Sequence, residues 1–174
     1  MSCGTDDSAW HAYFFRTDHH WKPQTAVQAA GIVAEKLSGM GVPVDTSRYT
    51  VDAYDWEIRK DFFLGSHGKK VTLARTNAED FPVAEPKQDI KLHFVVPARD
   101  IDSIGGFSQI YDRHAMETRD LYHAHPYEGY GYGNQAMETF VNLSQPETGK
   151  KILAITDSFG DPMIPFLSTG VREI

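Results

Sequence analysis

The stretch KKILAITDSFGDP, residues 150–162, contains the strongest fold signal in the chain. Residues 152–156 form an unbroken apolar run, which is typical of a strand buried on both faces in a parallel sheet that helices cover. Residues 157–162 predict a sharp turn, and the apolar residues 163–167 predict the start of a helix. We therefore expect this end of the chain to fold as strand, turn and helix.

The other end of the chain repeats this order. The aromatic residues of the segment 10–16 predict a short strand, and a polar loop follows at 17–22. Pro23 suits the first position of a helix, because its missing N–H group has no helical partner there. Apolar residues then recur at steps of three and four until glycine and proline end the pattern. These apolar residues are Val27, Ala30, Val33, Leu37 and Met40.

The middle of the chain has the composition of short strands and turns. Strands are expected at 49–58, 90–96 and 108–111, and turns at 65–68, 84–86 and 104–106. A loop is expected at 127–134 and a helix at 135–143. We interpret residues 1–174 as one α/β domain, whole or a piece of a larger one, in which residues 45–134 form a β-rich insertion.

Composition excludes several classes of protein. The 24 acidic residues outnumber the 17 Lys and Arg, and a net charge of −7 argues against a nucleic-acid-binding protein. No apolar run is long enough for a membrane segment, and the N-terminus has no features of a signal peptide. Cys3 is the single cysteine, which excludes an internal disulfide and a cysteine-based zinc site. With 41% hydrophobic residues, the chain can form a packed core.

Ser158 is the best candidate for a nucleophile. A serine between a strand and a helix lies at the carboxyl edge of the sheet, where open α/β folds bind ligands. The backbone N–H groups of Phe159 and Gly160, at the start of the helix, are candidate donors to an oxyanion. The alternative for this serine is a helix cap, which is a commoner role for the residue.

A nucleophilic serine needs a base, and the base needs a group that orients it. Asp18 and His20 supply both, because residues two apart in an extended loop lie on one side and leave His19 pointing away. The alternatives are a helix cap for Asp18 and an ordinary loop histidine for His20. With Ser158, the two residues make a predicted Ser-His-Asp set.

These residues also carry a family resemblance. The stretch YFFRTDHHWKP, residues 13–23, resembles the signature of DHHW proteins, relatives of the alginate O-acetyltransferases in the SGNH-hydrolase-like superfamily. Residues 151–160 resemble the second block of these proteins, and residues 61–66 resemble a further segment. The resemblance implies a permuted, three-layer α/β/α SGNH-hydrolase-like core in which Ser158 is the nucleophile, His20 the base and Asp18 its orienting group. It implies no metal and no organic cofactor.

The resemblance also implies a function. That function is O-acetyl transfer to a bacterial cell-envelope polysaccharide, or hydrolysis of its acetyl esters, with an extracytoplasmic or membrane-associated location. Members of the family continue through further strands after the second block. We therefore expect an incomplete core here, and a second copy of the chain is one way to complete the sheet.

Two other readings stay open. His123 and His125 could join residues 18–20 in a metal-dependent hydrolase, although solvent-exposed loop histidines are the simpler interpretation. A carbohydrate-binding module or degenerate relative without catalysis is the other reading, although aromatic side chains are more often part of a core. The aromatic residues predicted to contact a polysaccharide are Trp21, Tyr130 and Tyr132.

Overall fold

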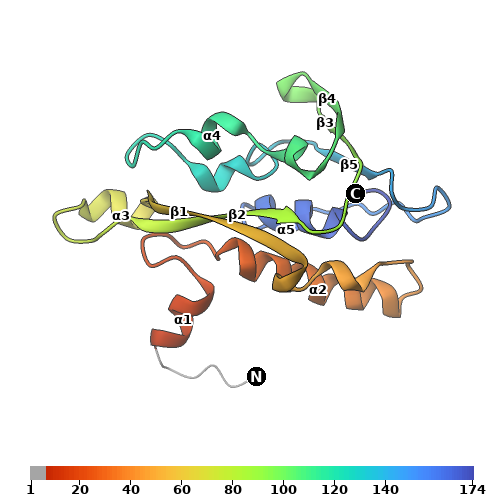
Figure 1. Cartoon of the computed structure of the whole chain (residues 1–174), viewed down its shortest axis with the longest axis horizontal. Coiled ribbons are helices and arrows are strands. Elements are labelled where there is room, and N and C mark those ends of the chain that lie inside the picture. Colours follow the sequence, from red (N-terminus) through yellow and green to blue (C-terminus); the bar gives the residue numbers. More distant parts are fainter. Residues whose placement is uncertain (1–6) are drawn as a thin grey trace.

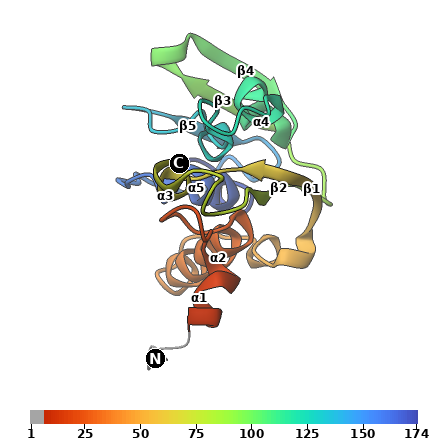
Figure 2. The same cartoon turned by 90° about the vertical axis from the view of Figure 1, so that its left-hand side faces the viewer.

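The computed structural model describes residues 7–174, so Cys3 and the N-terminal stretch searched for a signal peptide lie outside the described residues. Three layers are stacked in Figures 1 and 2. One outer layer holds helices α1 (Asp7–Tyr13) and α2 (Pro23–Gly39), and the middle layer holds strands β1 (Tyr54–Phe63) and β2 (Glu79–Pro86) with helix α5 (Gly160–Ser168). The other outer layer contains α4 (Arg113–Glu117) and the strands β3 (Leu92–Val96), β4 (Ile101–Gly105) and β5 (Thr139–Asn142).

The predicted helix after Pro23 is confirmed as α2. Its buried face consists of small residues at helical spacing, and it packs against α5. Ala26, Ala30 and Ala34 are all completely buried. Since these side chains are short, the two helices approach closely, and this contact determines where the loops before both helices meet.

The β1–β2 hairpin is antiparallel, with Tyr54 opposite Pro86 and Ile58 opposite Pro82. The predicted strand at 49–58 begins later, because residues 46–48 and 51–53 form 3₁₀ turns. The predicted turns at 84–86 and 65–68 are wrong: the first lies in β2 and the second begins the short helix α3 (Ser66–Val71). Proline is tolerated in β2 because the two-stranded hairpin leaves outer edges that need no N–H donor.

The second sheet has the order β4-β3-β5 and is also antiparallel. The prediction at 90–96 is confirmed as β3. The helix predicted at 135–143 is wrong, because Phe140 and Asn142 are buried alternately in β5, which is the period of a strand. Residues 101–105 form β4 where a turn was predicted at 104–106, and residues 107–110 form a 3₁₀ turn where a strand was predicted.

The segment 10–16 is also corrected. Residues 7–13 are helical, and the rings of Trp10 and Phe14 lie 5.0 Å apart at a separation of four residues. Aromatic residues favour strands in general, but this spacing also lets two rings meet on one side of a helix.

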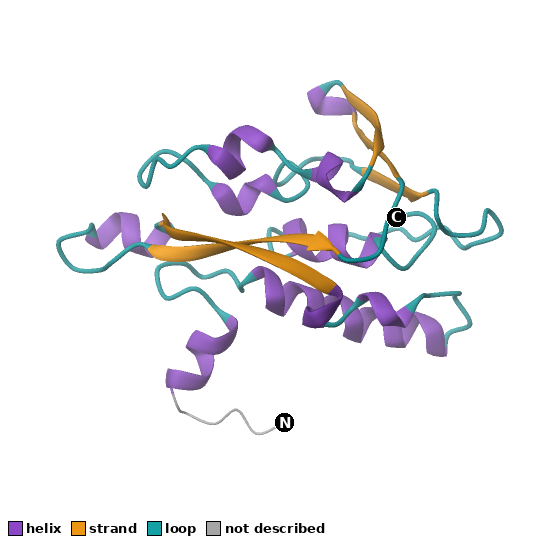
Figure 3. Cartoon of the chain, viewed as in Figure 1, coloured by secondary structure: helices purple, strands orange, loops and turns teal. Residues whose placement is uncertain are grey.

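The predicted strand at 152–156 is absent. These residues are neither strand nor helix, and Leu153 and Ile155 are 88% and 93% exposed. All pairings between the named strands are antiparallel, so the parallel sheet expected from this apolar run does not occur in the described part of the chain. Figure 3 shows how much of the chain is loop. The structure is a mixed α/β fold with two small antiparallel sheets.

No helix among residues 7–174 has the length and apolar character that crossing a bilayer requires.

Candidate active site

Asp18, His20 and Ser158 form a continuous hydrogen-bonded chain. The Nδ1 atom of His20 lies 2.5 Å from Oδ1 of Asp18, and its Nε2 atom lies 2.8 Å from Oγ of Ser158. His20 and Ser158 are separated by 138 residues in the sequence. They meet because one stands just before α2 and the other just before α5, and these two helices pack against each other.

The carboxylate of Asp18 has partners for both of its oxygens. Besides the ring of His20, Oδ1 accepts the backbone N–H of His20 at 3.0 Å, and Oδ2 accepts the backbone N–H of Ser66 at 2.6 Å. Gly65 permits this approach, since a Cβ atom there would lie 2.3 Å from Cβ of Asp18. Gly65 and Ser66, at the start of α3, therefore hold the Asp18 carboxylate in place.

Burial would raise the pKa of the Asp18 carboxyl. The hydrogen bonds from the His20 ring, from Ser66 and from the His20 backbone, together with the His20 charge, outweigh burial and hold this pKa well below its usual value. Asp18 therefore stays ionised and can orient the imidazole and stabilise its protonated form.

Glu79 anchors the loop that carries Asp18. Its carboxylate accepts the Arg16 N–H at 3.0 Å, the Thr17 N–H at 2.7 Å and the Thr17 hydroxyl at 2.6 Å. The Thr17 hydroxyl oxygen in turn accepts the Gly65 N–H at 3.0 Å. The side chain of Glu79 reaches this loop from β2, and nothing in the sequence around it indicates this role.

Aromatic rings surround the imidazole of His20. Tyr127 stacks on it with ring centroids 4.2 Å apart and an angle of 24° between the planes, and Phe159 lies at 5.3 Å. Tyr127 is 4% exposed, and within the described residues neither its hydroxyl nor the buried Nε1 of Trp21 has a hydrogen-bond partner. The sequence does not predict the contact between Tyr127 and His20, because it depends on how the chain folds.

The backbone groups predicted for an oxyanion hole already have partners. The Phe159 N–H donates to Oδ1 of Asp157 at 3.1 Å, and the Gly160 N–H donates to the Asp157 carbonyl at 2.8 Å. Among the described residues, the Ser158 N–H makes no hydrogen bond. The free donor at this turn is therefore the amide of the serine itself.

The aromatic residues predicted to bind a polysaccharide are placed differently from one another. Tyr130 is completely buried and its hydroxyl donates to the Pro82 carbonyl, so it is a core residue and offers no surface to a sugar. Tyr132 is partly buried and stacks on Phe94. Trp21 is partly buried against Phe159, with centroids 5.1 Å apart, and is the one of the three beside the candidate nucleophile.

The histidines proposed as metal ligands do not come together. The His123 ring lies 3.0 Å from a carboxylate oxygen of Asp120, and Nδ1 of His125 lies 3.3 Å from Nζ of Lys69. Asp18, His19 and His20 alone have ligand atoms within 4.8 Å of one another among the residues searched. Both ring nitrogens of His20 are engaged by Asp18 and Ser158, so a metal there would have to replace these contacts.

A cavity of about 300 Å³ adjoins the turn at Ser158. Asp161 and Glu138 line it together with Asp157, and no Lys or Arg does. Burial raises the pKa of Asp161 to about 7 against the opposing effect of His20, and burial together with the charge of Asp161 raises the pKa of Glu138 to about 8. The sequence gives no signal for this pair, because burial causes both shifts.

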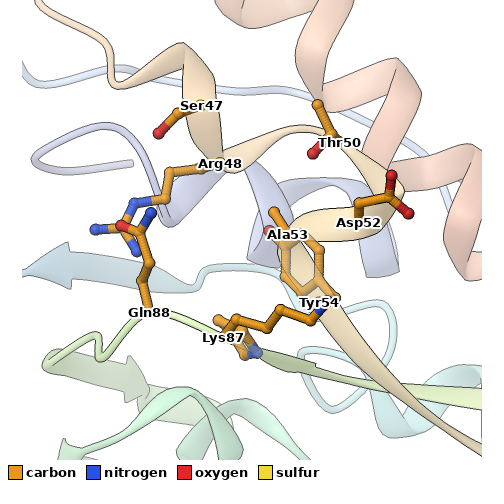
Figure 4. Close-up of a pocket in the computed structure, with 9 residues that line it drawn as sticks. Ser47, Arg48, Thr50, Asp52, Ala53, Tyr54, Lys87 and Gln88 are labelled. Atoms are coloured by element: carbon orange, nitrogen blue, oxygen red, sulfur yellow. The ribbon is translucent and has the colours of Figure 1, made fainter.

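Another cavity, of about 240 Å³, lies at the opposite end of α5 (Figure 4). Arg48, Tyr54 and Lys87 are among the residues that line it, and the Tyr54 hydroxyl is 3.4 Å from Oγ1 of Thr169, just beyond the last residue of α5. Nine residues of helix span about 14 Å, so this cavity is separate from the triad.

No family model and no curated protein sequence matches the chain. Solved structures do match it. A DHHW family protein from Eubacterium siraeum is 20% identical with a TM-score of 0.60, over 91% of this chain and 48% of that one. PatB1 from Bacillus cereus, solved with a sulfonyl adduct, is 15% identical with a TM-score of 0.66, over 97% of this chain and 52% of that one. A second PatB1 structure has a TM-score of 0.60 at 14% identity, with 98% and 55% coverage.

The chain therefore spans about half the length of the solved structures that it matches. Because the sequence identities are only 20%, 15% and 14%, the similarity to these structures shows a shared fold and nothing more. The chain shares a mixed α/β fold with a DHHW family protein and with PatB1.

Proposed function

We propose that the chain carries the acyl-transfer site of an O-acetyltransferase or acetyl esterase. The observation that supports this proposal best is the chain of hydrogen bonds from Asp18 through His20 to Ser158. The burial of Asp18 and the stacked ring of Tyr127 add to it, because both fix the imidazole in one orientation. The DHHW resemblance and the fold shared with a DHHW family protein favour a cell-envelope polysaccharide as the acceptor.

The proposed reaction begins with His20. With its Nδ1–H donated to Asp18, the Nε2 atom takes the proton of Ser158 as Oγ attacks the carbonyl carbon of an acetyl donor. The tetrahedral intermediate collapses, the proton on Nε2 passes to the leaving oxygen, and an acetyl-serine forms. A sugar hydroxyl or water then loses its proton to Nε2 and attacks the acetyl group, which restores Ser158.

The Ser158 N–H is our proposed oxyanion donor, since it is the amide of this turn without a partner. The Phe159 N–H is a second donor if Asp157 rotates away from it. Neither step needs a metal or an organic cofactor.

Hydrolysis of 4-nitrophenyl acetate tests the proposal. We expect Ser158→Ala and His20→Ala each to lower kcat by at least about 1,000-fold, because nucleophile and base act as one unit. Ser38→Ala and His123→Ala are matched controls on exposed positions and should keep the activity of the unchanged protein. Phenylmethylsulfonyl fluoride should add one sulfonyl group, located at Ser158 by mass spectrometry, and activity should survive EDTA.

Esterase activity that persists in Ser158→Ala would exclude this nucleophile. Polysaccharide binding that persists in both variants, with no turnover in any protein, would favour the binding-module interpretation. Transfer and hydrolysis are distinguished by adding an oligosaccharide acceptor and measuring its acetylation by mass spectrometry.

A further inference from the structure

An exposed apolar segment, residues 152–156, precedes the candidate nucleophile. The Ile152 N–H donates to the Glu173 carbonyl, but no backbone group of residues 153–156 is hydrogen-bonded within the described part of the chain. Leu153 and Ile155 are almost fully exposed. Unpaired backbone beside exposed apolar side chains is the pattern of a strand that lacks its partner.

The existing contact defines which edge is free. Lys151 pairs with Glu173 in parallel and the Ile152 N–H points toward Glu173. If the strand continues from this contact, the backbone groups of Leu153 and Ile155 point to the opposite, open edge, because these groups alternate in direction along a strand. A second strand can therefore bind there without displacing Glu173.

The sequence of the segment is complementary to itself. Lys151 precedes the apolar residues and Asp157 follows them, so the two ends carry opposite charges. In an antiparallel pairing centred on Ala154, Leu153 lies opposite Ile155 of the second copy and Lys151 lies opposite Asp157. This register also satisfies the open edge, since Leu153 and Ile155 then form the hydrogen-bonded pairs. The same side chains share one face, which places both apolar pairs between the two ionic pairs.

We propose that residues 151–157 form an antiparallel strand pair with the same residues of a second copy of this chain, about a two-fold axis at Ala154. Opposite charges at both ends favour this occupant over an unrelated strand. In the folded chain Nζ of Lys151 lies 2.7 Å from Oε1 of Glu173. The lysine side chain is long and exposed, so its ammonium group can contact both Glu173 and Asp157 of the second copy. Seven paired residues bury less than the roughly 1,200 Å² of a stable interface, so the dimer forms at high concentration only.

Charge exchange provides a sharp test by sedimentation equilibrium between about 1 µM and about 1 mM. Lys151→Asp places two carboxylates opposite each other at both ends of the pair, and Asp157→Lys places two ammonium groups there. We expect each variant alone to dimerise at least about tenfold more weakly than the unchanged protein. An equimolar mixture of the two variants restores opposite charges at both ends and should dimerise again.

Leu153→Pro removes an N–H group that would donate across the strand pair and should abolish the dimer. The control is Lys70→Asp, an exposed charge reversal outside the segment, which should leave the dimer unchanged. Circular dichroism checks that every variant is folded. Hydrogen exchange of the Leu153 and Ile155 amides should slow as the concentration rises, because these two amides donate across the pair.

Three results would overturn the proposal. A protein that stays monomeric to about 1 mM does not use this surface for a second copy. A dimer that the variants leave unchanged forms through another surface. Slow exchange of residues 153–156 in the monomer would show that this chain itself covers the segment. None of these results depends on catalysis by Ser158.

Discussion

At the scale of single residues, hydrogen bonds and stacked rings together fix the position of His20. Asp18 and Ser158 are hydrogen-bonded to its two ring nitrogens, and the ring of Tyr127 stacks on one face of the imidazole. The hydrogen bonds orient the ring within its plane, and stacking restrains its tilt. A base that is restrained in this way is already placed for proton transfer.

Tyr127 should act as a positioning residue through its ring. We expect Tyr127→Leu to lower kcat for 4-nitrophenyl acetate by about 10- to 100-fold with a small change in KM, because a misplaced base slows proton transfer. Tyr127→Phe keeps the ring and should keep kcat within about threefold. Equal losses in the two variants would show that stacking is not what matters.

Gly65 should be essential for the position of Asp18. An Ala at this position would place its Cβ within 2.5 Å of Oδ2 of Asp18 and of the Thr17 carbonyl oxygen. We expect Gly65→Ala to lower the free energy of unfolding by about 1–3 kcal/mol and to reduce kcat. Gly39→Ala is the matched control, since a Cβ there meets nothing within 4 Å. Unchanged stability and activity in Gly65→Ala would contradict the packing described here.

At the scale of secondary-structure elements, the contact between α2 and α5 brings the two halves of the candidate site together. His20 lies just before α2, which begins at Pro23, and Ser158 lies just before α5, which begins at Gly160. The distance between the imidazole and the hydroxyl therefore depends on how closely the helices pack.

Overpacking this contact should separate the two halves. We expect Ala30→Leu, at a completely buried position of α2, to cost about 1–3 kcal/mol of stability and to lower kcat at temperatures where the variant is still folded. Gln28→Leu adds a leucine to an exposed position of the same helix and should change neither quantity. The measurements are chemical denaturation and the esterase assay, and a destabilised variant with full activity would contradict this coupling.

At the scale of the whole molecule, the cavity beside α5 should make stability depend on pH. The pKa values of Glu138 and Asp161 are about 8 and about 7 in the folded protein, above their usual values. The folded state therefore binds protons that the unfolded state releases, and stability falls as pH rises from about 4 through about 8. Asp18 has the opposite effect, because its lowered pKa makes stability fall as the medium becomes acidic.

Glu138→Gln should remove part of the loss of folding stability at high pH. We expect the Tm of this variant to exceed that of the unchanged protein at pH 8 and to approach it at pH 5, where the native carboxyl is protonated. Gln28→Ala, which replaces an uncharged residue on the exposed face of α2, should show no such pH dependence. A Tm difference that is the same at both pH values would mean that ionisation of Glu138 has no part in it.

The sequence alone determined the local features of the site. Pro23 and the apolar spacing after it predict α2, and the pattern at 157–167 predicts the turn and helix at Ser158. The selection of Asp18, His20 and Ser158 followed from residue chemistry and a family resemblance, and the structure places the three within hydrogen-bonding distance, while their catalytic role stays a proposal. Such features are local because capping, helical spacing and turn residues act over a few positions.

Only the tertiary structure decided what depends on distant contacts. Burial of Phe140 belongs to the alternating pattern of strand β5, where the sequence predicted a helix. Residues 65–68, predicted as a turn, begin helix α3 and bring Gly65 against Asp18. The apolar run at 152–156 has the composition of a buried strand, but composition does not supply a neighbouring strand, and without one these residues are exposed. A strand is stabilised by hydrogen bonds to another segment, whereas a helix makes its hydrogen bonds within itself. For this reason the helix at Pro23 could be predicted from the sequence, and the parallel sheet expected around residues 152–156 could not.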